Sequence, residues 1–239
     1  LCDIFVTCDK YITRILYCQH KMWNIYNIRN LLEDGLFFII FDIDATHKFR
    51  GDQLMEGLRI SRLLPEQAEE YIHFFDTTDH DDNVDEHKCY CVCWSNDNCA
   101  GKDFSKVENR RAYAEQYVRN GNVQGYLAYD GEEIVGWCNA NTKADCLNCE
   151  SWRRFMDYVP TDDFESELIV KSVFCFVIAS GMRWNGIATQ LLKRVCEDAV
   201  SDGFDVIEAY PYRNADRLSA FCGYEEMYKK CGFEVFYEQ

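Results

Sequence analysis

Proline and positive charge are both scarce in this sequence. Its 239 residues include only three prolines, and 25 Lys and Arg residues face 41 Asp and Glu residues, which gives a formal net charge of −16. Nucleic-acid binding needs clustered Lys and Arg that neutralise phosphates, so the acidic balance disfavours a nucleic-acid partner. It also disfavours docking on an anionic membrane surface. An acidic protein attracts cationic ligands, which is compatible with an amine substrate.

Long hydrophobic runs and a secretory leader are also missing. Apolar stretches such as Leu36–Phe41 are far shorter than the roughly 20 residues that cross a membrane. No basic segment followed by an apolar stretch and a small-residue cleavage site opens the sequence. We therefore expect a cytoplasmic protein whose 14 cysteines are reduced thiols rather than a disulfide framework. Hydrophobic residues make up 48% of the chain, which is enough for a substantial core.

The first 54 residues differ in pattern from the rest. They start at Leu1 rather than Met and mix aromatic and β-branched residues without a clean helix or strand period. Within them, Lys21–Leu32 is compatible with a helix and Phe37–Ile43 with a strand. We interpret residues 1–54 as an N-terminal extension of unknown role. It is either an addition upstream of a native start at Met55 or a small packing appendage.

Residues 55–239 predict one mixed α/β domain. Alternation and helical periodicity appear in the order β-α-α-β-β-β-α-β-α-β, which indicates a largely antiparallel sheet with flanking helices. The expected strands are Gly57–Leu64, Val123–Tyr129, Glu133–Asn141, Lys171–Ala179, Phe204–Tyr210 and Phe233–Tyr237, and the expected helices are Glu66–Phe75, Ser105–Asn120, Gly186–Ser201 and Leu218–Cys231.

Local signals support several of these boundaries. Pro65 suits the first turn of a helix. Ser105 followed by Glu108 matches a capping box, and Asp130-Gly131 is typical of a hairpin turn.

The sharpest motif is Arg183-Trp184-Asn185-Gly186-Ile187-Ala188, between a buried strand and an amphipathic helix. A loop that enters a helix leaves backbone N–H groups unpaired, and together with the helix dipole they attract anions. Gly186 lacks the Cβ that blocks close approach, and Arg183 can add a charge-assisted contact to phosphate oxygens. The segment is not a P-loop, because no Gly-Lys-Ser/Thr follows, and it lacks the glycine spacing of a Rossmann turn.

The spacing Arg-x-x-Gly-x-Ala resembles the pyrophosphate-binding motif of the GNAT superfamily of acyl-CoA N-acyltransferases. The preceding strand Phe174–Ile178 and the downstream segment Glu226–Phe233, similar to a Tyr-x-x-x-Gly-Phe ending, agree with the family from about Leu58 to Phe236. The resemblance implies a GNAT-like central, mostly antiparallel sheet with a V-shaped splay between its fourth and fifth strands. It also implies transfer of an acetyl group from acetyl-CoA to a primary amine of a small molecule or polypeptide. A catalytically degenerate acyl-CoA-binding module is the alternative.

The same resemblance assigns the coenzyme-binding residues. The pantetheine arm would pair with the backbone of the fourth strand, and the diphosphate would cap the following helix. The simpler interpretation of Phe176, Val177 and Ile178 is that they are part of a core strand. Both interpretations can hold, because only backbone atoms would bind the coenzyme. The implied residues are Phe176, Val177, Ile178, Arg183, Trp184, Asn185, Gly186, Ile187 and Ala188.

Two residues are candidates for proton transfer. Tyr228 matches the tyrosine that protonates the coenzyme thiolate in many family members, and its alternative role is that of a core aromatic residue. Glu208 in the fifth strand is the candidate general base. Strand alternation can also turn Glu208 to solvent or into an ion pair.

The acceptor pocket is expected near the end of the Glu133–Asn141 strand. Trp137, Asn139 and Asn141 would offer an aromatic wall and two amides, helped by the polar, Cys-rich loop Thr77–Lys102. The alternative is that these are ordinary core and surface residues. The Cys-x-Cys-x-Cys run that starts at Cys89 lacks the spacing of a structural zinc knuckle, so we expect no metal.

Two departures from the family pattern stand out. Trp184 occupies a position where relatives carry small or charged residues, although only its backbone is required. The chain also ends just after Phe233–Tyr237, where the family usually adds one more strand. Either the N-terminal extension covers the exposed sheet edge or the chain is incomplete. A homodimer is an open alternative to a monomer.

Overall fold

The computed structural model describes residues 13–18, 55, 57–79, 84–95, 100–156, 168–211 and 220–238. The helix expected at Lys21–Leu32 and the strand expected at Phe37–Ile43 lie outside these ranges. No helix within them is long and apolar enough to cross a membrane.

The described strands form one seven-stranded sheet in the order β2-β3-β4-β5-β6-β1-β7. Neighbouring strands are antiparallel except for β5 and β6, which run parallel. The mostly antiparallel sheet expected from the sequence is confirmed. The strands are β1 (Thr13–Cys18), β2 (Arg59–Arg62), β3 (Gly125–Asp130), β4 (Glu133–Thr142), β5 (Val170–Ile178), β6 (Val206–Ala209) and β7 (Glu234–Glu238).

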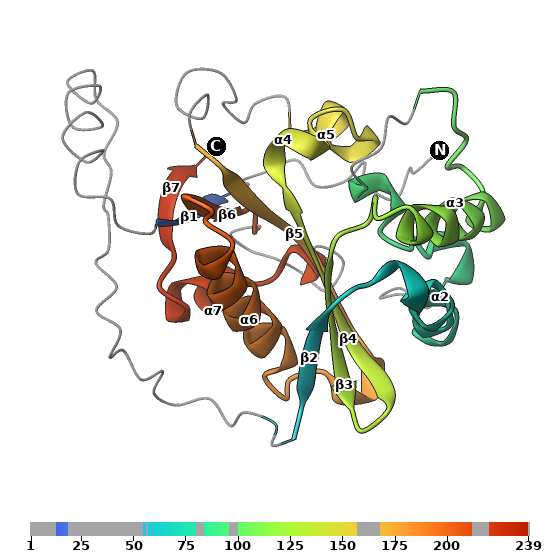
Figure 1. Cartoon of the computed structure of the whole chain (residues 1–239), viewed down its shortest axis with the longest axis horizontal. Helices are drawn as coiled ribbons and strands as arrows, with labels where there is room; N and C mark the ends of the chain where they lie inside the picture. The colour runs from blue at the N-terminus through green and yellow to red at the C-terminus, as the bar shows by residue number, and fades with distance from the viewer. Residues whose placement is uncertain are drawn as a thin grey trace.

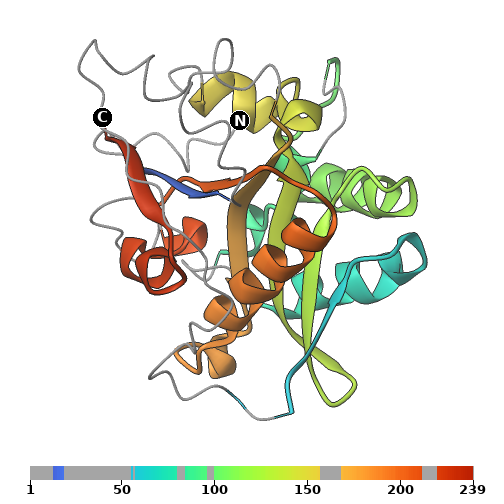
Figure 2. The ribbon, with the colours of Figure 1, turned by 60° about the vertical axis from the view of Figure 1, so that its left-hand side comes forward.

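Helices cover both faces of the sheet. In Figure 1 and Figure 2, α2 and α3 lie on one face and α6 and α7 on the other. The helices are α2 (Ala68–Thr77), α3 (Val107–Arg119), α4 (Lys143–Cys146), α5 (Glu150–Phe155), α6 (Ile187–Ser201) and α7 (Glu225–Lys230), with short 3-10 helices at Pro65–Gln67, Asp85–His87, Val92–Trp94, Ser180–Met182 and Ala220–Cys222.

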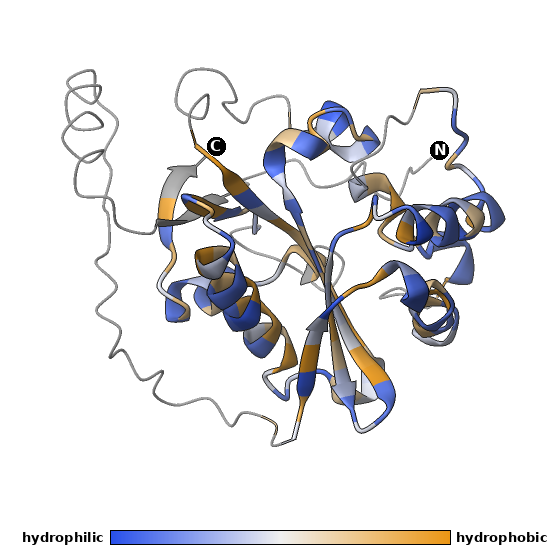
Figure 3. Cartoon of the chain, in the orientation of Figure 1, coloured by the Kyte–Doolittle hydropathy of each residue, from blue (hydrophilic) through white to orange (hydrophobic). Residues whose placement is uncertain are grey.

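Each face carries its own hydrophobic core. On one face, α6 buries Leu191, Leu192 and Val195 against β3, β4, β5 and α7. On the other, α2 and α3 pack against Leu127 and Trp137. The dense apolar strand predicted at Lys171–Ala179 is β5, which runs through the middle of the molecule and is largely coloured as hydrophobic in Figure 3. Because β5 is covered on both faces, it reads as a continuous apolar run rather than an alternating one.

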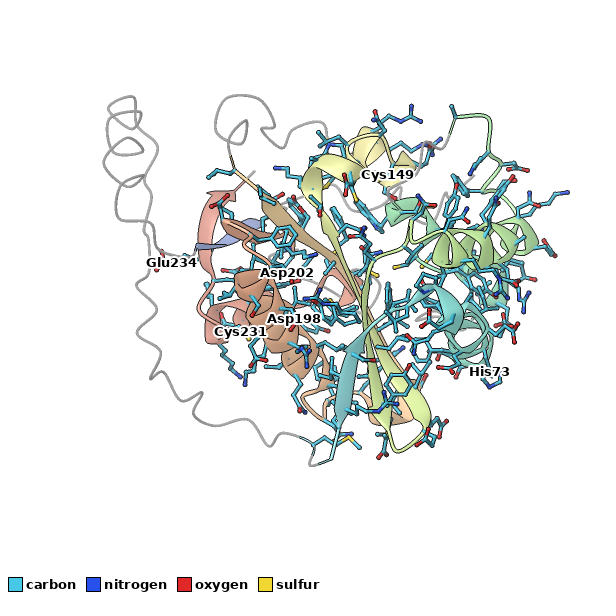
Figure 4. All side chains as sticks on the ribbon, viewed as in Figure 1. His73, Cys149, Asp198, Asp202, Cys231 and Glu234 are labelled. Carbon is cyan, nitrogen blue, oxygen red and sulfur yellow. The ribbon has the colours of Figure 1, made fainter. Side chains whose placement is uncertain are left out.

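Ion pairs tie α6 to the edge strand β2. Arg62 lies 2.9 Å from Asp198 and 2.7 Å from Asp202, both on α6 or at its C-terminal end (Figure 4). Burial alone would raise the pKa of Asp198, but hydrogen bonds from Arg62 and Arg194 outweigh burial and lower this pKa. These contacts help to fix the orientation of α6, whose N-terminus is the candidate anion site.

The predicted order of elements is confirmed, and three local predictions are corrected. The capping box at Ser105 is wrong, because α3 begins at Val107 and the Ser105 N–H instead donates to Asp103 Oδ1 at 2.9 Å. The last helix is shorter than predicted. Gly223, with a φ of +81°, interrupts it between the 3-10 helix Ala220–Cys222 and α7. Two short helices, α4 and α5, lie between β4 and β5, where the sequence predicted none.

An N-terminal strand lies between the last two strands of the sheet. β1 pairs antiparallel with both neighbours, so that Ile15 faces Ala209 of β6 on one side and Val235 of β7 on the other. β7 is therefore the last strand at this end of the described sheet, and β1 is its neighbour (Figure 1). The division of the chain at Met55 stays a prediction.

We expect a chain that starts at residue 19 to unfold at a lower temperature than the full chain. Loss of β1 leaves the backbone edges of β6 and β7 unpaired and prone to pair with other molecules. The midpoint should fall by roughly 5–10 °C, with a larger aggregated fraction in size-exclusion chromatography. A chain that starts at residue 13, which keeps β1, is the control. Equal midpoints for the two truncations would show that β1 does not support the sheet.

Candidate active site

The two central parallel strands separate after a short paired stretch. Pairing of β5 with β6 runs only from Val170 to Val173. From Phe174 to Ile178, no described strand pairs with β5 on the side of β6. Here β5 carries an irregularity, because Phe174 is skipped between the pairs that join this strand to β4. Such bulges re-aim a strand. Besides the strands that pair with it, β5 contacts the 3-10 helix Ala220–Cys222.

The loop after β5 leads directly to the N-terminus of α6. Trp184 and Gly186 both have left-handed backbone conformations, with φ of +68° and +73°. The first turn of α6 is closed by Gln190 N–H, which donates to Gly186 O at 3.0 Å. No described residue accepts a hydrogen bond from the N–H groups of Gly186, Ile187 or Ala188. Unpaired N–H groups at the positive end of a helix of 15 residues form an anion-binding arrangement.

Side chains hold this loop against the end of β5. Arg183 Nε donates to Ile178 O at 3.2 Å, and Asn185 Nδ2 donates to Met182 O at 3.3 Å. A Cβ at Gly136 of β4 would lie 3.0 Å from side-chain atoms of both Ile178 and Ile187. A larger residue there would require these two side chains to shift, so the glycine favours the close approach of α6 to the sheet. The predicted coenzyme-binding residues therefore lie together, at the end of the unpaired β5 edge.

Tyr228 of α7 lies on the same side of β5. It is fully buried, its ring centroid is 6.4 Å from that of Phe176, and its hydroxyl donates to Cys222 O at 2.8 Å. Burial raises the pKa of Tyr228 well above its usual value, so the hydroxyl carries its proton at neutral pH. A protonated hydroxyl beside β5 has the chemistry of a proton donor.

Glu208 of β6 lies at the point where the two strands part. It is paired in register with Ser172, next to the last pair between β5 and β6. Its carboxylate is fully buried and accepts hydrogen bonds from Ser172 Oγ at 2.9 Å and from the Tyr210 hydroxyl. Lys143 Nζ, also buried, lies 3.1 Å from Glu208 Oε1. Of the two alternatives to a base that strand alternation allowed, exposure to solvent and an ion pair, the structure has the ion pair.

Sequence reasoning missed the partners of Glu208. Lys143 begins α4, which is too short to show a helical period in the sequence. Ser172 lies on β5 and Tyr210 directly follows β6, and both segments are mostly apolar. The one available signal was Lys171-Ser172, two polar residues at the start of a strand that is otherwise dense in apolar ones.

The three predicted acceptor residues share one face of β4. Trp137 is buried in the core, with its ring 5.0 Å from Tyr71. Asn141 Nδ2 donates to Asn139 Oδ1 at 2.8 Å and to Trp94 O at 3.3 Å. Asn139 Nδ2 and Asn141 Oδ1 are buried without a hydrogen-bond partner in the described part of the chain. Unpartnered buried polar atoms are costly, so the two amides are candidates for binding a polar group.

Aromatic rings and thiols surround these amides. Trp94 stacks on Phe174 with centroids 4.5 Å apart, and Trp152 lies edge-on to Phe174 at 6.1 Å. The Sγ atoms of Cys91 and Cys175 are 2.6 Å apart, and burial raises the pKa of the Cys91 thiol. Among the residues that the structure describes, no group of three or more His, Cys, Asp or Glu side chains is arranged to hold a metal ion.

The chain matches a family model and several solved structures. The model described as "Acetyltransferase (GNAT) family" matches residues 97–233. No curated protein matches the chain. A ribosomal-protein-alanine N-acetyltransferase from Brucella melitensis biovar Abortus 2308 is 13% identical, with a TM-score of 0.37 over 62% of this chain and 75% of that one. An aminoglycoside acetyltransferase, meta-AAC0020, from an uncultured soil metagenomic sample is 12% identical, with a TM-score of 0.38 over 66% and 78%.

Proposed function

Since the chain belongs to the GNAT acetyltransferase family, we propose that it is an N-acetyltransferase that moves an acetyl group from acetyl-CoA to a primary amine. One observation carries the proposal. The edge of β5 from Phe174 to Ile178, beside which no described strand pairs on the side of β6, leads directly to the N–H groups of Gly186, Ile187 and Ala188, for which no described residue is an acceptor. An extended amide chain that ends in a diphosphate is the ligand that fits such a sequence of backbone groups.

The coenzyme is held mainly by main-chain atoms in this proposal. The amides of the pantetheine arm pair with Phe176, Val177 and Ile178 as an added strand would. The diphosphate accepts hydrogen bonds at the N-terminus of α6, and the Arg183 guanidinium lies next to it. This arrangement places the thioester toward the bulge at Phe174, where β5 and β6 separate.

The chemistry is a nucleophilic substitution at the thioester carbonyl. A neutral amine attacks the carbon and the carbonyl oxygen becomes negative, so a backbone N–H near Val177 or Ile178 can stabilise it. The C–S bond then breaks, and the thiolate takes the proton of the Tyr228 hydroxyl. The nitrogen is positively charged after the attack, and it loses one of its two protons to a base and keeps the other in the amide product. The Tyr228 phenolate then regains a proton, from that base or from solvent, before the next turnover. Holding the two substrates together supplies a large share of the acceleration.

We assign the base role to Glu208, acting through a hydroxyl group. The carboxylate is fully buried and already accepts from Lys143, Ser172 and Tyr210. It therefore does not need to touch the amine, because the hydroxyl of Ser172 or Tyr210 can pass the proton to it. Asn139 and Asn141, with Trp137 behind them, are the proposed residues on the acceptor side.

Incubation with acetyl-CoA and a panel of primary amines tests the proposal. Mass spectrometry should detect an acetylated amine together with free coenzyme A. Coenzyme binding in calorimetry without any acetylated product would instead identify an acyl-CoA-binding module. Absence of both binding and product would contradict the proposed function.

Replacing Tyr228 by Phe should lower kcat more than it weakens coenzyme binding. Loss of the general acid is expected to reduce kcat by about 100-fold, whereas the dissociation constant of coenzyme A should change little. Tyr71→Phe is a matched control, because Tyr71 is equally buried and its hydroxyl also donates to a backbone carbonyl, that of Tyr90, at 2.9 Å. An unaltered kcat in Tyr228→Phe would make Tyr228 a packing residue.

A further inference from the structure

Trp184 is the most exposed of the large hydrophobic side chains in the described ranges. Its side chain is 85% exposed, compared with 53% for Ile169 and 48% for Leu64. Its φ of +68° lies in the left-handed region, which disfavours every residue with a Cβ and a bulky one most. Neither burial nor backbone preference therefore explains a tryptophan at this position. A strained, exposed aromatic residue points to a ligand.

Trp184 has an aromatic neighbour from a different element. The rings of Trp184 and Tyr224 have centroids 5.9 Å apart and planes inclined by 33°. Tyr224 is the N-cap of α7, one helical turn before Tyr228, which faces Phe176 of β5. Along α7, Tyr228 thus lies beside the proposed pantetheine strand and Tyr224 beside the loop that leads to α6.

Coenzyme A carries an adenosine on the far side of its diphosphate from the pantetheine arm. If the diphosphate binds at Gly186, the base lies within one ribose of it, close to the loop that holds Trp184. We propose that Trp184 and Tyr224 form an aromatic platform that stacks against the adenine of the coenzyme. The inference rests on the proposed function, because the diphosphate at α6 is what brings the base within reach.

The charge of the protein makes such a platform useful. A net charge of −16 opposes a ligand that carries several negative phosphate charges. Stacking of a neutral base on an aromatic ring is not subject to this repulsion, and it contributes to nucleotide binding without any base-specific hydrogen bond. A surface tryptophan beside the phosphate site therefore supplies affinity that long-range electrostatics does not.

Calorimetric titration with two ligands tests the platform. Coenzyme A contains the adenosine, whereas 4′-phosphopantetheine keeps the arm and one phosphate but lacks it. Trp184→Ala should bind coenzyme A about 10-fold more weakly, equivalent to about 1.4 kcal/mol, and should bind 4′-phosphopantetheine within about twofold of the wild type, since only the base-stacking contribution is lost. Trp184→Phe, which keeps a ring, should retain most of the affinity for coenzyme A.

Fluorescence supplies a second readout. Trp184 is more exposed than Trp94, Trp137 and Trp152, so its emission should respond most directly to a base that stacks on it. Coenzyme A should therefore quench the emission of the wild type more strongly than that of Trp184→Phe. Ile169→Ala, which removes another exposed apolar side chain next to the opposite end of β5, should leave both affinity and quenching unchanged.

The outcomes separate the platform from the coenzyme site. If the wild-type protein does not bind coenzyme A, the proposed function itself fails. If the wild type binds coenzyme A and Trp184→Ala binds it equally well, only the platform is overturned. The same holds if Trp184→Ala weakens the binding of coenzyme A and of 4′-phosphopantetheine to the same extent. Quenching that is as strong in Trp184→Phe as in the wild type also overturns it.

Discussion

Replacing Gly186 by Glu is expected to abolish coenzyme A binding while the domain stays folded. The new side chain would place a carboxylate among the N–H groups of Ile187 and Ala188, where the diphosphate is proposed to bind. It would compete for those donors and repel the phosphates, so the dissociation constant should rise by at least about 100-fold, or about 2.7 kcal/mol. Calorimetric titration measures the affinity, and circular dichroism follows the fold.

The opposite end of the same helix offers a matched control. Gly203 has a φ of +81°, and a Cβ added there would have no atom within 4 Å, so Gly203→Glu introduces the same residue with similar backbone strain. It should lower the melting temperature about as much as Gly186→Glu and leave coenzyme binding intact. Equal affinities for wild type and Gly186→Glu would refute the placement of the diphosphate.

Replacing Lys143 by Met should cause the largest loss of stability among single changes at the site. Glu208 would remain as a buried carboxylate without its cationic partner, which is expected to cost about 3–5 kcal/mol. Chemical denaturation measures the change. Lys171→Met is the control, because Lys171 is also buried, its pKa is lowered by burial, and its ammonium lies 4.4 Å from the centre of the Phe204 ring. The free energy of unfolding of Lys171→Met should be close to that of the wild type.

A double variant separates the structural role of the ion pair from its catalytic role. Lys143→Met/Glu208→Gln removes both charges and keeps an amide that can bond to Ser172 and Tyr210, so most of the lost stability should return. If Glu208 is the base, this refolded variant still has a strongly reduced kcat. Recovery of stability together with wild-type kcat would make the pair purely structural. Equal stability of Lys143→Met and the wild type would contradict the burial argument.

Local patterns explain why the order of elements could be predicted from the sequence. The helical period of α6 and the apolar density of β5 are properties of short segments, and they are set by the surfaces that each segment buries. The glycine at the start of α6 marked the candidate anion site for a similar reason, because a left-handed residue next to a helix is a local requirement.

Features that depend on distant residues could not be predicted in this way. β1 lies between β6 and β7 through backbone pairing with segments near the other end of the chain, and nothing in its own sequence specifies those partners. Lys143 meets Glu208 across 65 positions. The aromatic pair of Trp184 and Tyr224 likewise joins two segments that are not adjacent in sequence. The sequence suggested an ion pair as one possible arrangement of Glu208, but it did not indicate which basic residue is the partner.

The central claim is that the backbone of β5 and the first turn of α6 together bind the coenzyme. A crystal structure with coenzyme A tests it most directly. The account predicts that the pantetheine amides pair with Phe176 and Ile178, and that the diphosphate oxygens accept hydrogen bonds from the N–H groups of Gly186, Ile187 and Ala188. Coenzyme A bound elsewhere, with those N–H groups facing only water, would contradict it.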